Sequence, residues 1–580
     1  MPMNDFILKK INFWLNSNID IADKKTIQNL IDTNNEAELS DAFYQDLEFG
    51  TGGLRGIMGL GSNRINKYTI GAATQGLSNY LNKTFDTQIK VAIAYDSRNQ
   101  SQSLAQVVAN VFSANGIYVY LYENLRPTPQ LSFTIRHLGC QSGVVLTASH
   151  NPKEYNGYKA YWNDGGQIVP PHDRNITEEV RKITSFSQVK FEPNPALIQI
   201  LTPDFDEPYI NQILDLSIDK KGIAAQKDIK IVYSSLHGTG ITLVPTVLER
   251  MGFNNVHIVA EQATPDGNFP SLIAHPYPNP EEKTAMQLAL DQAQELNADL
   301  VMATDPDADR VGIAVKNNDG EFILLNGNQT GALLVAYILD AWQRADKFKG
   351  NEFVVRTIVT TAMIDKIAQS YGVKCYQTLT GFKYIAGLIK ELEGKEKFIV
   401  GGEESYGYLI GDNVRDKDAI ASCALIAEMA ASVKNSGLSL YNLLLELYKK
   451  YGVYQEQLKS VTLKGQDGAA LIGVMMQNFR RNPPKMLAGS QVVQILDYKK
   501  SIQYNVLEKT EVELKFEKSN VLQFVTQDGT IVSARPSGTE PKIKFYVSAT
   551  ADFSDVAHYE QVSQGLNQKI AKIIADLGVG

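Results

Sequence analysis

Three aspartates at alternate positions, Asp305, Asp307 and Asp309, directly follow an apolar run at residues 298–304. A short apolar run is typical of a buried strand, so a tight loop at its end can turn all three carboxylates towards one point. Hard cations such as Mg²⁺ prefer oxygen ligands in this arrangement. A calcium EF-hand begins in the same way, but it requires a Gly and a later Glu where this chain has Arg310 and Lys316. The spacing favours a magnesium site, and a solvated acidic turn is the alternative.

A second apolar run, at residues 142–148, ends abruptly in Ser149 and His150, which an Asn-Pro pair follows. In open α/β sheets ligands bind beyond the carboxyl ends of the strands, so this position is suited to chemistry. The stretch lacks the GxSxG elbow of α/β-hydrolases, and a serine hydrolase triad is therefore poorly supported. From the residues alone, Ser149 either caps a turn or takes part in catalysis.

One turn near the end of the chain gathers hydroxyl groups, a guanidinium and an ammonium around a glycine. With free backbone N–H groups, such a turn can hold a phosphate, although its spacing is not that of a Walker loop. Ordinary turn chemistry is the alternative. The turn consists of Arg535, Ser537, Gly538, Thr539 and Lys542.

Two further stretches present polar groups in similar positions. Glu403, Glu404 and Ser405 follow the apolar run of residues 396–402, and carboxylate beside hydroxyl suits recognition of sugar hydroxyls. A capping role for Ser405 is the alternative. Lys383 follows a glycine turn, where it can bind phosphate or move a proton, whereas most lysines are surface residues.

The elements that position these groups alternate between strand-like and helix-like segments. Strands are expected at 90–96, 117–123, 142–149, 229–236, 298–305, 311–315, 352–360 and 396–403, and helices at 247–252, 284–296, 331–342 and 384–393. From about residue 456 strands dominate until a final helix from about residue 556. This pattern predicts an α/β fold with parallel or mixed sheets and an α+β domain at the end. Polar breaks divide the chain into expected domains at 1–205, 206–325, 326–455 and 456–580.

Composition excludes several classes of function. The 580 residues are 44% hydrophobic, enough for several cores, and the net charge is −8 without a basic stripe. No apolar stretch approaches the roughly 18 residues that a membrane span needs, and the start of the chain is too polar for a secretory signal. The isolated Cys140, Cys375 and Cys423 fit a reducing compartment. We therefore expect a cytoplasmic protein that binds neither nucleic acid nor membrane.

The four polar stretches together resemble a known family. TASHNPKEYNGYK at 147–159, DPDADR at 305–310, GEESYGY at 402–408 and RPSGTEPK at 535–542 resemble, in this order, the four active-site loops of the α-D-phosphohexomutase superfamily. That superfamily includes phosphoglucomutase and phosphomannomutase, and the similarity begins at FGTGGLRG, residues 49–56. It implies a heart-shaped protein of three α/β domains with mixed sheets and a C-terminal α+β domain. Each domain would give one loop to a central cleft.

The resemblance also implies a role for residues around the reacting phosphate. Ser149 is similar to the family's phosphoserine, which donates its phosphoryl group to a sugar phosphate, and it would share Mg²⁺ with the three aspartates of DPDADR. His150, Lys159 and Arg55 would assist the transfer. Lys383 is our candidate for the general acid/base.

The remaining residues would bind the substrate. Arg310 would add positive charge at the reacting phosphate, while Glu403 and Ser405 would hold ring hydroxyls. The C-terminal loop would hold the phosphate that is not reacting, through Arg535, Ser537, Gly538, Thr539 and Lys542.

Departures from one branch of the family suggest the substrate. Bacterial phosphomannomutase/phosphoglucomutase enzymes typically have Met and His where this chain has Glu404 and Gly407, and NVRDKDA at 413–419 resembles the phosphoglucomutase branch. We therefore expect interconversion of glucose 1-phosphate and glucose 6-phosphate through glucose 1,6-bisphosphate. Phosphomannomutase and phosphopentomutase are alternatives, and a metal-dependent sugar phosphatase or a non-catalytic sugar-phosphate binder is an alternative of another class. The expected partners are small sugar phosphates, and the expected state is a monomer or homodimer.

Overall fold

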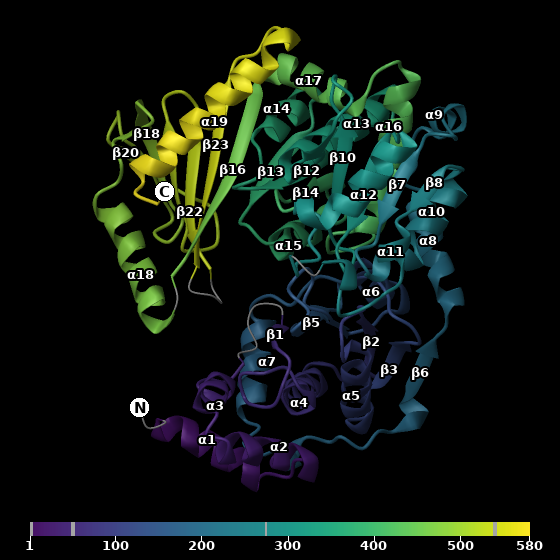
Figure 1. Cartoon of the computed structure of the whole chain (residues 1–580), viewed down its shortest axis with the longest axis vertical. Helices are drawn as coiled ribbons and strands as arrows, with labels where there is room; N and C mark the ends of the chain where they lie inside the picture. Colours follow the sequence, from purple (N-terminus) through teal and green to yellow (C-terminus); the bar gives the residue numbers. More distant parts are fainter. Residues whose placement is uncertain (1–3, 48–52, 273–274, 464, 538–541, 580) are drawn as a thin grey trace.

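In a computed structural model of the chain, residues 4–47, 53–272, 275–463, 465–537 and 542–579 are described. The strands among these residues form four sheets. Each sheet with its helices is called a domain below, numbered in chain order. Figure 1 shows the first domain at the bottom, the second and third above it, and the fourth at the upper left.

The first domain has a six-stranded sheet between helices. Its strands are β1 (Gly53–Ile57), β2 (Lys90–Tyr95), β3 (Tyr118–Tyr122), β4 (Ser142–Leu146), β5 (Tyr155–Trp162) and β6 (Ile198–Leu201). Its helices are α4 (Lys67–Thr84), α5 (Ser101–Ala114), α6 (Thr128–Leu138) and α7 (His172–Arg181). Alternate residues of β2 face opposite sides of the sheet: Val91 and Ile93 pack in the core with α4 and α5, whereas Ala92 and Ala94 pack with α6. Burial on both faces explains why the strands of this sheet are apolar throughout.

Three helices precede the first sheet and pack against one another and α4. They are α1 (Asp5–Asn16), α2 (Ile21–Asp32) and α3 (Glu36–Phe43). Trp14 meets the rings of Phe43, Tyr68 and Phe186 edge to face, with centroids 5.1–5.7 Å apart. This aromatic cluster attaches the N-terminal helices to α4, on which Tyr68 lies.

The second and third domains follow the same plan. The second contains β7 (Ile231–Ser234), β8 (Val256–Ile258), β9 (Leu300–Thr304), β10 (Val311–Lys316) and β11 (Phe322–Leu325), with α8 (Glu207–Leu214), α9 (Lys220–Ala225), α10 (Val244–Met251), α11 (Ala260–Ala263) and α12 (Lys283–Leu296). The third contains β12 (Glu352–Thr357), β13 (Lys374–Thr378), β14 (Lys397–Gly402) and β15 (Tyr408–Ile410), with α13 (Gly327–Arg344), α14 (Met363–Ser370), α15 (Phe382–Leu392), α16 (Ala419–Asn435) and α17 (Leu440–Tyr451).

The first three sheets share one order of four strands. These orders are β5-β4-β2-β3, β10-β9-β7-β8 and β15-β14-β12-β13. In each sheet a parallel strand leads directly into an antiparallel neighbour, as β4 leads into β5. The loop between those two strands therefore lies at the carboxyl end of the parallel strands, where open α/β sheets bind ligands. The three loops are residues 147–154, 305–310 and 403–407.

The fourth domain is different, because its sheet is antiparallel. It contains β16 (Val453–Thr462), β17 (Met486–Leu487), β18 (Ser490–Asp497), β19 (Ile502–Asn505), β20 (Thr510–Glu513), β21 (Leu522–Thr526), β22 (Ile531–Pro536) and β23 (Lys542–Ala551), with α18 (Gly465–Arg481) and α19 (Tyr559–Asp576). Helix α19 lies across the sheet (Figure 1). It packs there because Leu566, Ile570 and Ile573 on one side of the helix are buried.

All the strands and helices that the sequence predicts in the first three domains are present, with ends shifted by a few residues. The prediction of an α/β fold in which a strand-rich region ends in a helix is confirmed. The last strand of the second sheet ends at Leu325, and the first strand of the fourth begins at Val453. The expected domain boundaries themselves stay predictions.

Candidate active site

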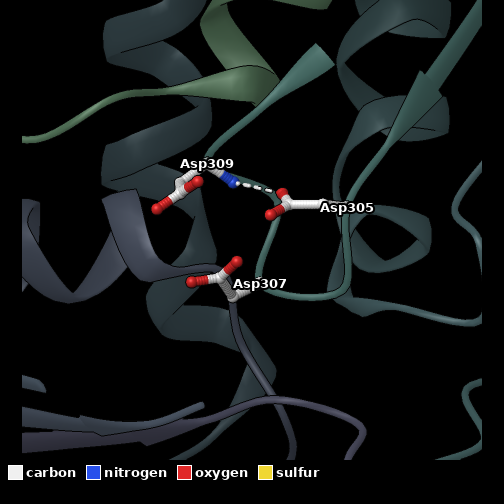
Figure 2. Close-up of side chains that lie close together, drawn as sticks. All are labelled: Asp305, Asp307 and Asp309. Carbon is white, nitrogen blue, oxygen red and sulfur yellow. Dashed lines mark hydrogen bonds between the residues drawn. The ribbon is translucent and has the colours of Figure 1, made fainter. Parts of the chain in front are cut away.

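The three aspartates of the loop before β10 lie together. One carboxylate oxygen from each lies within 4.8 Å of the others, all three side chains are buried, and Figure 2 shows them around a common space. The N–H groups of Asp309 and Arg310 each donate to Asp305 Oδ1 at 3.1 Å and thereby close the loop. Asp307 Oδ1 and Asp309 Oδ1 are buried and have no hydrogen-bond partner among the described residues. Clustered carboxylates with unpaired oxygens fit a hard divalent cation, so these residues can hold the metal ion that the sequence predicts.

Two lysines from other domains touch this acid cluster. Lys159 on β5 places Nζ 2.7 Å from Asp307 Oδ2 and 3.2 Å from Asp309 Oδ2. Lys417, in the loop before α16, places Nζ 3.1 Å from the same Asp309 oxygen. Burial raises the pKa of Asp309, but the two lysines outweigh it and hold that pKa below its ordinary value. Burial and the charges of Asp307 and Asp309 raise the pKa of Asp305 well above its ordinary value.

Ser149 points into the same cluster from the first domain. Its buried hydroxyl donates to Asp305 Oδ2 at 2.7 Å, and His150 Nδ1 lies 3.2 Å from the same Oγ. Burial lowers the pKa of His150 well below its ordinary value, and the charges of Arg310 and Arg55 lower it further. The imidazole is therefore neutral at physiological pH, and the local positive charge comes from arginine and lysine. Arg310 itself donates to Glu281 at 2.9 Å.

The loop between β14 and β15, residues 403–407, rests on the start of α13. A Cβ on Gly327 would lie 2.0 Å from the carbonyl oxygen of Glu404, so only glycine permits this approach. Glu403 is buried, and its Oε1 accepts the N–H of Gly381 at 2.8 Å. Ser405, next to them, is partly exposed.

The side chain of Glu404 is only partly exposed. The hydroxyls of Thr357 and Thr360 each donate to its Oε2 at 3.2 Å. Burial raises the pKa of Glu404 to about 7, and the neighbouring Glu403 contributes in the same direction. This carboxyl is therefore only partly ionised near neutral pH.

Lys383 lies in the first turn of α15 and is partly buried, and this burial lowers its pKa. The charged groups that act on it are Asp173 of α7, Glu517, and Arg535 of β22. Lys383 therefore lies where the first, third and fourth domains approach one another.

The adjoining ends of β22 and β23 carry residues of the predicted phosphate cradle. Arg535 is paired in register with Lys544, and the Ser537 N–H donates to the carbonyl of Lys542 at 2.7 Å. Burial, Lys542 and Arg535 lower the pKa of Lys544. Three cations at one end of a hairpin fit an anion such as a phosphate. Gly538 and Thr539, also predicted for this cradle, lie outside the described residues.

Sequence comparison identifies the class of protein. The chain matches the four domain families of phosphoglucomutase/phosphomannomutase in order. Alpha/beta/alpha domain I matches residues 46–187, domain II 207–320, domain III 326–451 and the C-terminal domain 484–562. The chain belongs to the phosphoglucomutase/phosphomannomutase family. The predicted family, its four-domain α/β architecture and the mutase class of enzyme are confirmed.

Curated relatives named phosphoglucomutase resemble the chain along almost its whole length. The Staphylococcus haemolyticus protein is 36% identical over 548 residues, 94% of this chain and 97% of the relative. The Staphylococcus epidermidis protein is 35% identical over 96% of this chain and 99% of the relative. The Staphylococcus aureus protein is 36% identical over 93% and 96% respectively.

Solved structures of low identity share the fold. The open form of parafusin, a phosphoglucomutase from Paramecium, has a TM-score of 0.66 at 18% identity and covers 92% of this chain and 96% of its own. A phosphoglucomutase/phosphomannomutase family protein from Burkholderia thailandensis has a TM-score of 0.64 at 18% identity, covering 91% and 97%. Among the described helices, none is long and apolar enough to cross a membrane.

The sequence did not single out Lys417 or Lys544 as site residues. Lys417 lies in NVRDKDA, a stretch that suggested only a branch of the family. Its position between two aspartates is the feature of the sequence that could have indicated a site residue. Lys544 alternates with Lys542 on β23, so that both point to one face of the strand.

Proposed function

We propose that this chain interconverts glucose 1-phosphate and glucose 6-phosphate, with Ser149 as the phosphorylated residue and glucose 1,6-bisphosphate as the intermediate. The observation that carries the proposal is the 2.7 Å contact of Ser149 Oγ with Asp305 inside the acid cluster. A hydroxyl in this position lies among groups that can hold a cation and neutralise a phosphoryl group. The name shared by relatives of 35–36% identity supports glucose as the sugar.

The chemistry assigned to the first two loops is phosphoryl transfer. The bond from phosphorus to Ser149 Oγ breaks, and a new bond forms to a sugar hydroxyl, whose proton leaves to a base. Asp305, Asp307 and Asp309 would hold Mg²⁺, which would stabilise the negative charge of the phosphoryl group. Lys159, already paired with two of these aspartates, and Arg310 add positive charge from the protein.

The proton is best assigned to Lys383. A general base must be deprotonated near the working pH, and burial lowers the pKa of this lysine. Burial lowers the pKa of Lys417, but the Asp309 and Asp416 carboxylates raise it above its ordinary value. This side chain therefore stays charged. Lys417 therefore serves electrostatics, and Lys383 serves proton transfer.

The third and fourth domains hold the substrate in this proposal. Glu403 accepts hydrogen bonds from ring hydroxyls, and Ser405 accepts or donates them. The distal phosphate binds the cradle of the fourth domain, which consists of Arg535, Ser537, Gly538, Thr539 and Lys542 with Lys544 added. After the first transfer, the bisphosphate must reverse its orientation so that its other phosphate returns to Ser149. The expected cytoplasmic location and monomeric or dimeric state stay predictions.

Two measurements test the proposal. Glucose 1-phosphate with Mg²⁺ and a trace of glucose 1,6-bisphosphate should yield glucose 6-phosphate with little free phosphate, and faster than mannose or pentose 1-phosphates react. Intact mass should show a phosphoryl group that is lost, together with turnover, in Ser149→Ala and kept in the control Ser103→Ala, which changes an exposed serine of α5. Free phosphate at a comparable rate would instead identify a phosphatase, and turnover by Ser149→Ala would remove the phosphoserine.

A further inference from the structure

We propose that Arg98 is a positioning residue for this reaction, an inference that rests on the proposed function. Its guanidinium binds the backbone of residues 149–155, called the phosphoserine loop here, which begin within the loop after β4 and end at the first residue of β5. Nη2 donates to the carbonyls of Ser149, at 2.5 Å, and Asn151. Nη1 donates to the carbonyls of Pro152 at 2.8 Å and Tyr155 at 3.0 Å. One side chain therefore fixes four carbonyls of the loop and, with them, the place from which Ser149 Oγ reaches the acid cluster.

The backbone of Ser149 needs such support. Its φ is +51°, in the left-handed region that a residue with a Cβ adopts only when its surroundings determine it. Both backbone polar groups of Ser149 are held by side chains: the carbonyl accepts from Arg98, and the N–H donates to Thr147 Oγ1 at 2.8 Å. Without these bonds the residue can relax to an ordinary conformation, and its hydroxyl then leaves Asp305.

Arg98 is itself held from two sides. Its Nε lies 3.4 Å from Asp96 Oδ2, and both side chains are fully buried. The ring of Phe269, from the second domain, covers the guanidinium with its centroid 5.2 Å away. The same segment approaches so closely that a Cβ on Gly267 would lie 2.2 Å from the backbone nitrogen of Asn99. Arg98 is therefore sealed from substrate, and it can influence the reaction only through the loop.

An arginine is required for this geometry. The planar guanidinium presents donors in a fixed fork, so two nitrogens can each serve two carbonyls while Nε faces Asp96. A lysine keeps the charge opposite Asp96 but has a single nitrogen, which cannot span the four carbonyls. Arg98→Lys thus separates the charge of the side chain from its hold on the loop.

Arg98→Lys should lower kcat by about 100-fold, the effect of misplacing a reacting group by about 1 Å. KM for glucose 1-phosphate should not change, because Arg98 does not reach the substrate. The rate at which labelled glucose 1,6-bisphosphate phosphorylates Ser149 should fall in parallel with kcat. The matched control is Arg64→Lys, because Arg64 is also a buried arginine of the first domain, paired with Glu38 and Asp41. It should keep both rates.

Thr147→Val provides an independent variant, which decides the matter if Arg98→Lys does not fold. It removes the bond to the Ser149 N–H at constant shape. It also removes a hydroxyl that stabilises the buried Asp96 carboxylate, but Asp96 keeps its ion pair with Arg98. It too should lower kcat and leave KM unchanged. Normal kcat in Arg98→Lys or Thr147→Val, a rise in KM with normal kcat, or an equal loss of kcat in Arg64→Lys overturns the positioning role. Absence of phosphoserine and turnover in the unmodified protein would instead refute the proposed function, so the two failures are distinct.

Discussion

Replacing Lys417 with methionine should destabilise the metal-free protein by about 3 kcal/mol. Lys417 Nζ lies 3.1 Å from Asp309 Oδ2 and 2.9 Å from Asp416 Oδ1, and only 8% of the lysine side chain is exposed. Removing one partner of a buried ion pair costs about 3–5 kcal/mol, because it leaves an uncompensated charge. Asp309 keeps Lys159 at 3.2 Å, and Asp416 keeps the hydroxyl of Tyr161 at 2.7 Å. We therefore expect the lower end of the range.

The same substitution should strengthen Mg²⁺ binding, because it removes a cation that competes for Asp309. Since a ligand that binds the folded state stabilises it, Mg²⁺ should restore more stability to Lys417→Met than to the unmodified protein. Urea unfolding in chelator and in saturating Mg²⁺ measures the stability, and titration calorimetry measures the affinity. A matched control is Lys434→Met, which breaks an ion pair between the same two domains at 42% and 32% exposure. That pair should contribute no more than about 1 kcal/mol.

The reasoning fails if Lys417→Met and Lys434→Met lose similar stability in chelator. It also fails if Mg²⁺ binds Lys417→Met more weakly than the unmodified protein. Either result would mean that the ammonium of Lys417 does not compensate the acid cluster.

Three other substitutions have defined outcomes. Asp307→Asn should weaken Mg²⁺ binding at least about 10- to 100-fold, the loss typical even of outer-shell partners; unchanged activity at low Mg²⁺ would exclude Asp307 as a ligand. Arg535→Ala should lower kcat/KM by about ten- to a few hundred-fold, since a charge-assisted hydrogen bond contributes about 1.5–3 kcal/mol, while intact mass should show unchanged phosphoserine. Glu404 has a pKa of about 7 when folded and 4.5 as its ordinary value, so its ionisation destabilises the fold as pH rises through this window. Glu404→Gln removes that effect. The melting temperature of Glu404→Gln minus that of the unmodified protein should therefore rise from pH 5 to 7 and then level off. A difference that does not change with pH would contradict the raised pKa of Glu404.

The sequence predicts what depends on local pattern. Apolar runs that end in polar residues mark β4, β9 and β14, because a strand buried on both faces must be apolar and its end must turn. The alternation of Asp305, Asp307 and Asp309 likewise predicts that their carboxylates converge, and they do.

Contacts between distant segments could not be obtained in this way. Lys159, Asp309 and Lys417 meet only because the first three domains face one another, and no local spacing records that orientation. The role proposed for Arg98 depends on the positive φ of Ser149 and on Phe269 in another domain. From the sequence alone, Arg98 two positions after Asp96 indicates no more than an ordinary ion pair.

The shared strand order of the first three sheets bears on how such a site can arise. Three loops occupy one topological position, yet we propose a different role for each: the first carries the Ser149 hydroxyl, the second carboxylates for a cation and the third groups for sugar hydroxyls. When a backbone unit is repeated along a chain, its equivalent loops can line one site. The sequences of these loops can then differ in a few residues. The hydrogen-bonded strands on either side anchor the ends of each loop, so these changes leave the sheets intact. Three sheets of one strand order can therefore divide the work of a site without any new architecture.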